Sequence, residues 1–151
     1  MQFTTAIISA ITMAVASASV IGTQRYVTFK VSDFSAGCVA HSSQCLYSFT
    51  VIQPGTMETT GVKCTALVGS IDGTLPNIAQ WQGSCGDESS RTFWITREDA
   101  GLEFYVSQPV SPASNTTASY LIPNSELVLT PNTIGTTQSY TGPSDLDLYQ
   151  Y

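Results

Sequence analysis

The clearest pattern of apolar and polar positions lies in residues 91–110, where two alternating runs flank a polar connection over 98–101. Alternation with a period of two is typical of β-strands, and two such runs around a short turn predict a β-hairpin. A slip of one residue would move every side chain to the other face, so this pattern fixes the register. The predicted register gives one face to the core through two cross-strand pairs: Phe93 with Val106, and Ile95 with Phe104.

The opposite face of this hairpin carries an aromatic pair. Trp94 lies across from Tyr105, among threonine, serine and glutamate side chains. Large aromatic residues are mostly buried, so one interpretation is that a loop or a second sheet covers the pair. The other is an exposed contact surface, because Trp and Tyr are favoured anchors in protein interfaces. Both remain open, and Trp94 and Tyr105 are candidate partner-binding residues.

Further alternating segments predict more strands, separated by Pro- and Gly-containing turns. They are 26–32, 46–52, 62–68, 78–82, 119–122 and 126–130. The Ser- and Gly-rich segment 33–44 and the Pro- and Ser-containing segment 109–115 are predicted to be loops. About seven to eight short strands, roughly ten residues apart, predict an all-β domain, either an antiparallel β-barrel or a β-sandwich.

The C-terminal segment is less regular. From about residue 132 the chain contains Gly135, Gly142 and Pro143 with many threonines and serines, and its last acids alternate with leucines. Glycine, proline and small polar residues favour turns and loops. We therefore expect a loosely held tail from about residue 132, and whether its last residues dock on the domain stays open.

The first 18 residues have the pattern of a secretory signal. They carry no charged side chain, contain an apolar run over 6–15, and end in Ala16-Ser17-Ala18. The apolar run is too short for a membrane anchor, which must cross about 30 Å of hydrocarbon. We expect cleavage after Ala18, leaving one secreted, extracellular β-domain over 19–151.

Four cysteines follow the signal: Cys38, Cys45, Cys64 and Cys85. In an oxidising compartment an even number predicts disulfides. Three pairings are possible, and a meandering β topology favours the sequence neighbours, Cys38 with Cys45 and Cys64 with Cys85. A metal site is disfavoured because there is no C-x-x-C motif and His41 is the only histidine, so no metal or cofactor is predicted.

Charge narrows the classes of partner. The chain has 5 basic and 11 acidic residues, a net charge of −6. An acidic chain without a basic cluster is poorly suited to neutralise phosphates, which disfavours nucleic acid. Anionic membrane surfaces are disfavoured for the same reason, and no membrane partner is predicted.

Residues with catalytic chemistry are few. His41 lies in a Ser-rich segment without an orienting partner, and the adjacent acids Asp87-Glu88 and Glu98-Asp99 are typical of solvated turns. We therefore do not expect an enzyme. Asn115, in Asn-Thr-Thr, is the only N-x-[ST] acceptor, which predicts surface exposure and glycan attachment.

An ordered set of short motifs runs from Tyr26 to about Asn124: YVTFKVSDF, LYSFTV, VKCTA, WQGSCG, ITREDAGLEFYVSQPVS and SYLIPN. In these motifs the chain resembles the secreted fungal proteins of the major Alternaria allergen family, which includes elicitors of the plant hypersensitive response. The resemblance implies a compact β-barrel or sandwich with a Cys64–Cys85 disulfide. Family members commonly have a cysteine near the mature N-terminus that links a dimer, and a C-terminal cysteine pair. Both are absent here, so no covalent dimer is expected.

Three functions follow from these features. The resemblance implies a secreted effector or elicitor that binds a host plant extracellular protein, such as a thaumatin-like pathogenesis-related protein, and triggers or modulates defence and cell death. It also implies small phenolic ligands in some members. A second hypothesis is a small-ligand carrier that uses the mouth of a β-barrel. The third is a small wall-acting hydrolase that uses paired carboxylates.

Overall fold

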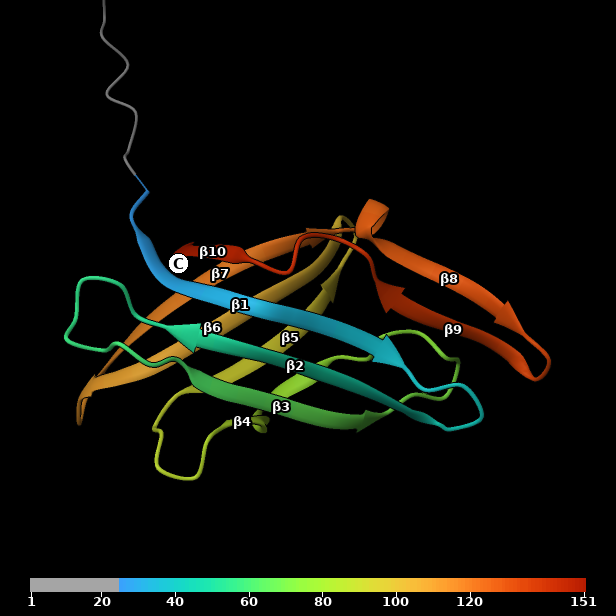
Figure 1. The fold of residues 1–151 in the computed structure, drawn as a ribbon, viewed down its shortest axis with the longest axis horizontal. Helices are drawn as coiled ribbons and strands as arrows, with labels where there is room; N and C mark the ends of the chain where they lie inside the picture. The colour runs from blue at the N-terminus through green and yellow to red at the C-terminus, as the bar shows by residue number, and fades with distance from the viewer. Residues whose placement is uncertain (1–24) are drawn as a thin grey trace, which may run out of the picture.

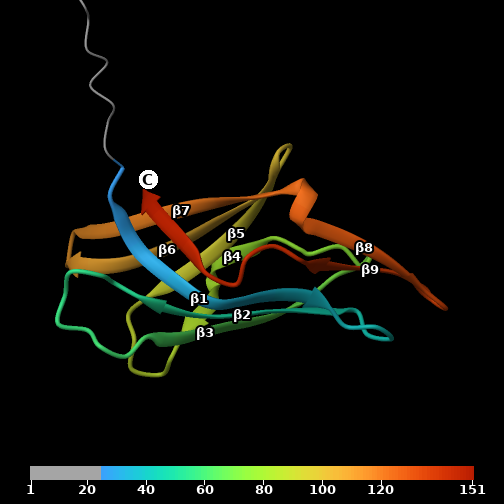
Figure 2. The same cartoon turned by 45° about the horizontal axis from the view of Figure 1, so that its top comes forward.

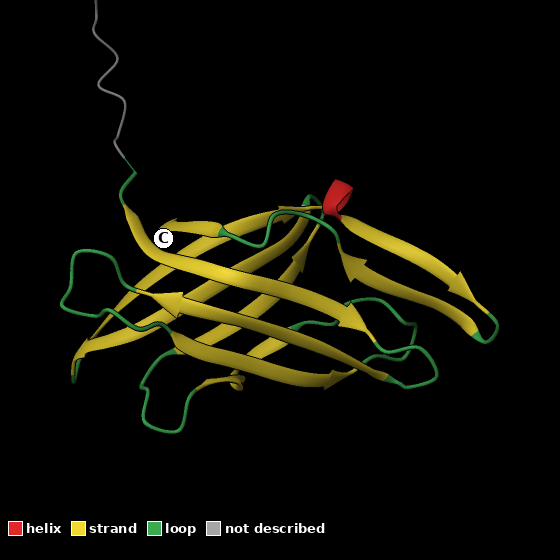
Figure 3. Ribbon diagram, viewed as in Figure 1, coloured by secondary structure: helices red, strands yellow, loops and turns green. Residues whose placement is uncertain are grey.

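The computed structural model describes residues 25–151, so the expected signal at 1–18 lies outside the described residues. Within residues 25–151 the chain forms ten β-strands and one short 3₁₀ turn, η1 (Asn124–Glu126) (Figures 1 and 3). The strands are β1 (Val27–Cys38), β2 (Gln44–Ile52), β3 (Val62–Gly69), β4 (Ile78–Cys85), β5 (Thr92–Glu98), β6 (Gly101–Ser111), β7 (Ser114–Pro123), β8 (Leu127–Asn132), β9 (Gly135–Tyr140) and β10 (Leu146–Gln150). No helix in this part of the chain has the length and apolar character needed to cross a membrane.

Eight of the strands close into an antiparallel barrel. Strands β1 to β7 pair in chain order, and β10 closes the circle by pairing with β7 on one side and β1 on the other (Figure 2). Strands β8 and β9 form a hairpin beside the barrel, joined to β1 where Gly37 pairs with Ser139. The predicted all-β antiparallel fold is confirmed, and it is the closed barrel.

The central hairpin, β5 and β6, has the predicted register. The three predicted pairs are present: Phe93 with Val106, Trp94 with Tyr105, and Ile95 with Phe104. Pairing continues to Glu98 and Gly101, so the connection is shorter than predicted. Gly101 is required there, because its φ is +153° and a Cβ at this position would clash with the carbonyl oxygen of Ile122.

Side chains fill the barrel interior. The core is built on edge-to-face aromatic contacts, with ring centroids 4.8 Å apart for Phe49 and Phe93 and 4.9 Å apart for Phe49 and Phe104. The largest fully buried side chains are Tyr47, Phe29, Phe49, Phe93, Phe104, Leu75, Ile78, Ile95, Leu102, Ile122, Leu148 and Val51. The four apolar residues predicted for the inner face of the hairpin are all in this core.

A loop closes one end of the barrel. The β3–β4 connection inserts Leu75, whose amide N–H donates to Oε1 of the buried Gln138 on β9 at 2.9 Å. The Tyr47 hydroxyl donates to the carbonyl of Pro76 at 2.8 Å, and Arg97 donates to the carbonyl of Leu75 at 2.8 Å. Burial raises the pKa of Tyr47, so its hydroxyl stays a donor.

The other end is closed by a buried ion pair. Arg91, 6% exposed, donates to both carboxylate oxygens of Glu58, at 2.7 Å and 2.6 Å. Nη1 also donates to the carbonyl of Val51, and Nε donates to the side-chain Oε1 of Gln108. The guanidinium lies 5.7 Å from the Phe29 ring centroid. The carboxylate of Glu58, two neutral oxygen acceptors and the Phe29 ring thus hold Arg91 over the core.

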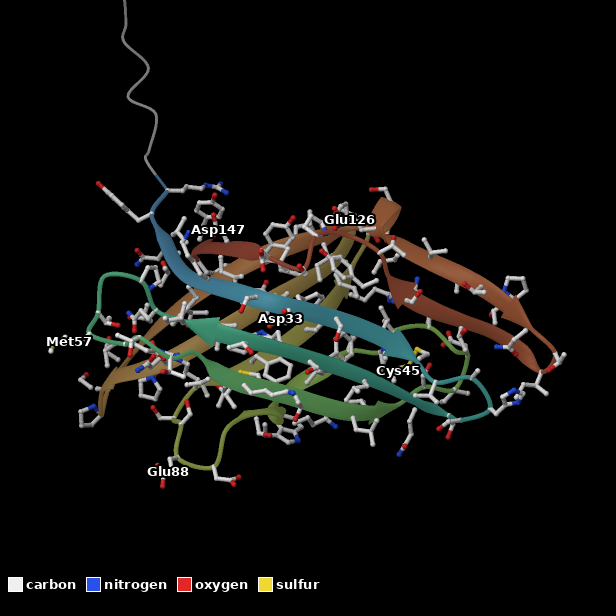
Figure 4. All side chains as sticks on the ribbon, viewed as in Figure 1. Asp33, Cys45, Met57, Glu88, Glu126 and Asp147 are labelled. Carbon is white, nitrogen blue, oxygen red and sulfur yellow. A yellow bond between two sulfur atoms is a disulfide. The ribbon has the colours of Figure 1, made fainter. Side chains whose placement is uncertain are left out.

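The loop predicted over 33–44 is wrong in its first half. Strand β1 continues to Cys38 because a β-bulge between Ser32 and Ser35 changes the register within the strand. Asp33, labelled in Figure 4, takes φ 53° in this bulge. Phe34 then lies inside the barrel, 3% exposed. The predicted loop over 109–115 is also largely strand, since β6 and β7 pair as far as Ser111 and Ser114.

The loosely held tail expected from residue 132 is wrong. Residues 135–140 are strand β9, and 146–150 are β10, which closes the barrel. Leu146 and Leu148 are 3% and 0% exposed, so their burial fixes this segment. The last residues are docked, and the C-terminus lies beside the start of β1 (Figure 1).

The predicted disulfides are confirmed. Cys38 bonds Cys45 between β1 and β2, and Cys64 bonds Cys85 between β3 and β4. Each bond joins residues that are directly opposite in the ladder. The first bond therefore clamps two paired strands rather than pinching off a loop.

Removing the Cys64–Cys85 bond with paired serine substitutions should cost more stability than removing Cys38–Cys45 in the same way. The two bonds span 21 and 7 residues, and the longer loop loses more entropy, a difference of about 1 kcal/mol. Cys64 and Cys85 are also buried, whereas Cys38 is partly exposed. Urea unfolding of the two double variants measures the difference, and equal midpoints would contradict it.

Candidate functional site

An aromatic row crosses the outer face of the barrel. Trp94 on β5 pairs with Tyr105 on β6, Tyr105 pairs with Ser119 on β7, and Ser119 pairs with Tyr149 on β10. Residues directly opposite in a ladder place their side chains on the same face of a sheet. Their neighbours on the same strands, Phe104 and Leu148, point into the core, so the row lies on the outside.

The rings of this row pack on one another. Trp94 and Tyr105 stack with centroids 4.9 Å apart and planes at 8°, and Tyr151 packs against Tyr105 at 5.3 Å and 83°. The Tyr151 backbone N–H donates to the carbonyl of Thr117 at 3.1 Å, which fixes the end of the chain beside β7. Trp94 and Tyr105 are half-buried, whereas Tyr151 is 80% exposed.

A hollow lies beside this row, and Ser119, the one small residue of the row, is part of its lining; Trp94 and Tyr105 are not. The hollow has a volume of about 620 Å³, and Tyr149 and Tyr151 line it together with Ser119. Glu103 and Arg25 also line it, so it holds one charge of each sign. We call Trp94, Tyr105, Ser119, Tyr149 and Tyr151 the aromatic groove.

The phenols of the groove are hydrogen-bond donors. Burial, and then the nearby Glu103 carboxylate, raise the pKa of Tyr105, so its hydroxyl keeps its proton at neutral pH. Within residues 25–151, the tyrosine hydroxyls of Tyr47 and Tyr140 donate to backbone carbonyls. Those of Tyr105, Tyr149 and Tyr151 have no acceptor in the same part of the chain, which leaves them available to a ligand.

The sequence predicted half of this site. Trp94 and Tyr105 are brought together as expected. They are neither fully covered nor fully exposed, because they lie on the outer face but are half-buried by each other and by Tyr151. Tyr149 and Tyr151 were missed, because their segment was interpreted as tail. The signal that could have found them is the alternation of Leu146 and Leu148 with polar residues, which predicts a strand.

The other predicted residues lie apart from the groove. Asn115 is exposed at the start of β7, as predicted, and its glycan remains a prediction. His41 is exposed in the β1–β2 turn with φ 65°. In the part of the chain that the structure describes, no three His, Cys, Asp or Glu side chains are grouped to hold a metal ion.

The adjacent acids are also exposed. Glu98 ends β5 and Asp99 lies in the β5–β6 turn. Asp87 and Glu88 lie on the β4–β5 loop, where Figure 4 labels Glu88. The latter pair borders an open pocket of about 790 Å³, whose lining includes the ion-paired Glu58. Of the three acids in this lining, Glu58 is held in an ion pair by Arg91.

No family model, no curated protein and no solved structure matches the chain. The resemblance to secreted fungal allergens and elicitors, which rests on the motifs quoted above, therefore stays a prediction. What the chain binds has to be inferred from its own surface.

Proposed function

We propose that the protein is a secreted effector or elicitor that binds a host extracellular protein through the aromatic groove. The observation that carries this proposal is the outward row of Trp94, Tyr105 and Tyr149, extended by Tyr151. Tryptophan and tyrosine are enriched among residues that dominate binding energy in protein interfaces. Two disulfides support action in an oxidising, extracellular compartment.

The host partner and the outcome come from the family resemblance. A plant pathogenesis-related protein of the thaumatin-like type is the proposed partner, and a triggered or modulated defence response with cell death is the proposed outcome. The carrier alternative is less well supported, because fully buried side chains occupy the barrel interior within residues 25–151. A small phenolic ligand would then have to bind an outer hollow.

Replacing Trp94 or Tyr105 by alanine should weaken partner binding about 30-fold, the equivalent of about 2 kcal/mol. Stability should fall less, by about 0.5 to 1.5 kcal/mol, because only the stacking of half-buried rings is lost. The measurements are recovery of the partner from plant extracellular fluid by the immobilised protein, leaf cell death, and thermal melting.

Trp81→Ala is the matched control. Trp81 is 86% exposed on β4, in the irregular stretch of the β4–β5 ladder between the Ile78–Ile95 and Gly83–Phe93 pairs. Its ring is not one of those that stack with Trp94 and Tyr105, so its removal should leave melting unchanged and should leave binding unchanged if the stacked rings are the contact. A folded Trp94→Ala protein that keeps full partner recovery and full cell-death activity would contradict the proposal. Equal losses in Trp81→Ala and Trp94→Ala would show non-specific adhesion of exposed rings.

A further inference from the structure

We propose that strand β8 binds an extended segment of another protein, which pairs with it as an added antiparallel β-strand. This second binding surface lies apart from the aromatic groove, so the inference goes beyond the proposed function and does not rest on it. Three observations carry it: the open edge of β8, the pattern of hydrogen-bonding groups on that edge, and the charge at its start.

β8 is the last strand of the sheet. Within residues 25–151 it pairs only with β9, whereas every barrel strand pairs on both sides. Figure 1 shows the β8–β9 hairpin extending beyond the barrel, with β8 on its outer side. Charged side chains commonly protect such an edge, but β8 has none, and its Val128 and Leu129 are 42% and 53% exposed. An edge of this kind is a template for a further strand.

The register identifies the backbone groups that face the open edge. The Thr141 N–H donates to the carbonyl of Glu126 at 2.8 Å, one step before the first ladder pair of β8 and β9. Hydrogen-bonded pairs recur every second residue, so the even-numbered residues of β8 bond to β9. Gln138, opposite Leu129, agrees, because its N–H points away from β8 and donates to the carbonyl of Gly73 at 2.8 Å. The odd-numbered residues of β8 therefore direct their N–H and C=O groups outward.

The edge offers more acceptors than donors. Its outward residues, Leu127, Leu129 and Pro131, present three carbonyls. The Leu127 N–H already donates to the carbonyl of Asn124, and proline has no N–H, so the N–H of Leu129 is the one free donor of this strand. A strand with its own N–H groups free can therefore form four hydrogen bonds here: two with Leu129, and one to each of the other two carbonyls.

The same pattern disfavours a second copy of the chain as the occupant. Every hydrogen bond between two β8 strands needs a donor, and each copy supplies only the N–H of Leu129. Two copies can therefore share at most two bonds in any register, against four with a strand of another protein. Pro131 and the occupied Leu127 N–H thus limit pairing of this edge with itself.

The side chains of β8 define the pattern of the bound segment. Leu127 and Leu129 lie on the face of the hairpin that also carries the buried Gln138 of β9, and Leu127 packs against the core. Side chains of the added strand opposite these two leucines would lie on the same face. Apolar residues at alternate positions would therefore cover Leu129 and extend the apolar surface beside the barrel.

Charge favours a basic residue at one end of the segment. Residues 98–151 contain acids but no Lys, Arg or His. Glu126 directly precedes β8, and a hydrogen bond of 2.8 Å from η1 to the carbonyl of Asp99 places the β5–β6 turn at the same end. One basic side chain, Arg97, donates to Gln138 on β9 at 3.0 Å, so the acids here are only partly balanced. An antiparallel segment ends at this point, and a basic C-terminal residue complements the charge.

The first test is a titration of the full secreted chain, ¹⁵N-labelled and with both disulfides intact, followed by NMR. The probe is the acetylated peptide Thr-Val-Thr-Val-Thr-Val-Lys, whose three valines can lie opposite the outward residues and whose lysine then lies opposite Glu126. It should shift the β8 amides in a saturable way and slow hydrogen exchange of the Leu129 amide at least about tenfold. Ser119, in the aromatic groove, should not shift. The same peptide with every amide N-methylated lacks donors and should not bind.

Two substitutions at one position isolate the hydrogen bond. Leu129→Ala and Leu129→Pro both remove the leucine side chain, but only proline also removes the outward N–H. Leu129→Pro should bind the peptide at least about fivefold more weakly than Leu129→Ala, as expected for one hydrogen bond. β9 does not use this N–H, so the hairpin should stay folded, which melting temperatures and the β9 amide shifts check.

A change of the terminal residue tests the charge. The peptide that ends in glutamate should bind about threefold more weakly than the one that ends in lysine at low salt. This difference should disappear at about 0.5 M NaCl, because salt screens exposed charges. An equal affinity of the two peptides at low salt would contradict the proposed basic end of the segment.

Three results would overturn the added strand: no saturable shift in β8, equal binding of the N-methylated peptide, or equal affinity of Leu129→Pro and Leu129→Ala. Shifts in β8 that grow with protein concentration without peptide would assign the edge to a second copy instead. Trp94→Ala should bind the peptide as the parent does. If Trp94→Ala loses partner recovery and β8 gives no response to the peptide, the proposed function stands and only the added strand is rejected.

Discussion

Replacing Leu148 by alanine should lower the free energy of unfolding by about 2 to 5 kcal/mol. Leu148 is fully buried where β10 closes the barrel between β1 and β7, and its removal leaves a cavity among rigidly packed neighbours. Urea unfolding followed by circular dichroism measures the loss. The same strand carries Tyr149, so the variant should also weaken binding at the aromatic groove.

Leu129→Ala is the matched control for this prediction. Leu129 lies on β8 of the outer hairpin and is 53% exposed, so the same chemical change should cost about 0.5 kcal/mol or less. A loss below about 1 kcal/mol in Leu148→Ala would show that β10 contributes little to closing the barrel, since buried leucines lose at least about 2 kcal/mol.

The central hairpin could be predicted because all its determinants are local. Both strands alternate, and one register satisfies the apolar face of each, so Phe93 and Phe104 identify the core without any other part of the chain. The outward side of Trp94 and Tyr105 follows from the same alternation. The cysteine pairs are local as well, with only 7 and 21 residues between the bonded partners.

The pairing of the closing strand could not be predicted, because its partners are distant in sequence. Leu146 pairs with Val31, and β10 has only five residues after a segment rich in glycine, proline and serine. Nothing in so short a stretch specifies a partner more than a hundred residues away. For the same reason the aromatic groove could not be predicted in full, since Tyr149 comes near Tyr105 only when β10 closes the barrel.

The bulge at Asp33 illustrates a different limit. A segment rich in serine, glycine and alanine favours a loop by composition. Tertiary packing outweighs this preference, because Phe34 gains more by burial in the core than the strand loses by carrying small residues.

Breaking the ion pair between Arg91 and Glu58 should cause a second large loss of stability, after that of Leu148→Ala. Glu58→Gln keeps the size of the side chain and removes its charge, which leaves the 6%-exposed Arg91 without a counter-ion. Breaking a buried pair in this way costs about 3 kcal/mol, the lower end of the usual range because the Glu58 side chain is 20% exposed. Urea unfolding at pH 7 measures the loss.

A double variant separates the charge from the packing. Glu58→Met with Arg91→Met removes both charges and keeps apolar bulk over the Phe29 ring, so it should recover most of the stability that Glu58→Gln loses. If the double variant is as unstable as the single one, the hydrogen bonds from Arg91 to Val51 and Gln108 matter more than its charge.

The same pair gives stability a defined dependence on pH. Hydrogen bonds from the Arg91 side chain, and a further one from the backbone N–H of Gln53, hold the pKa of Glu58 below its usual value. A lowered carboxyl pKa stabilises the folded state above the unfolded pKa, about 4.3, and this contribution is lost as the pH falls through the lower folded value. Parent and Glu58→Gln proteins should therefore differ most near neutral pH and converge in acid. A difference that stays constant from pH 7 down to the acid limit would mean that ionisation of Glu58 does not stabilise this end of the barrel.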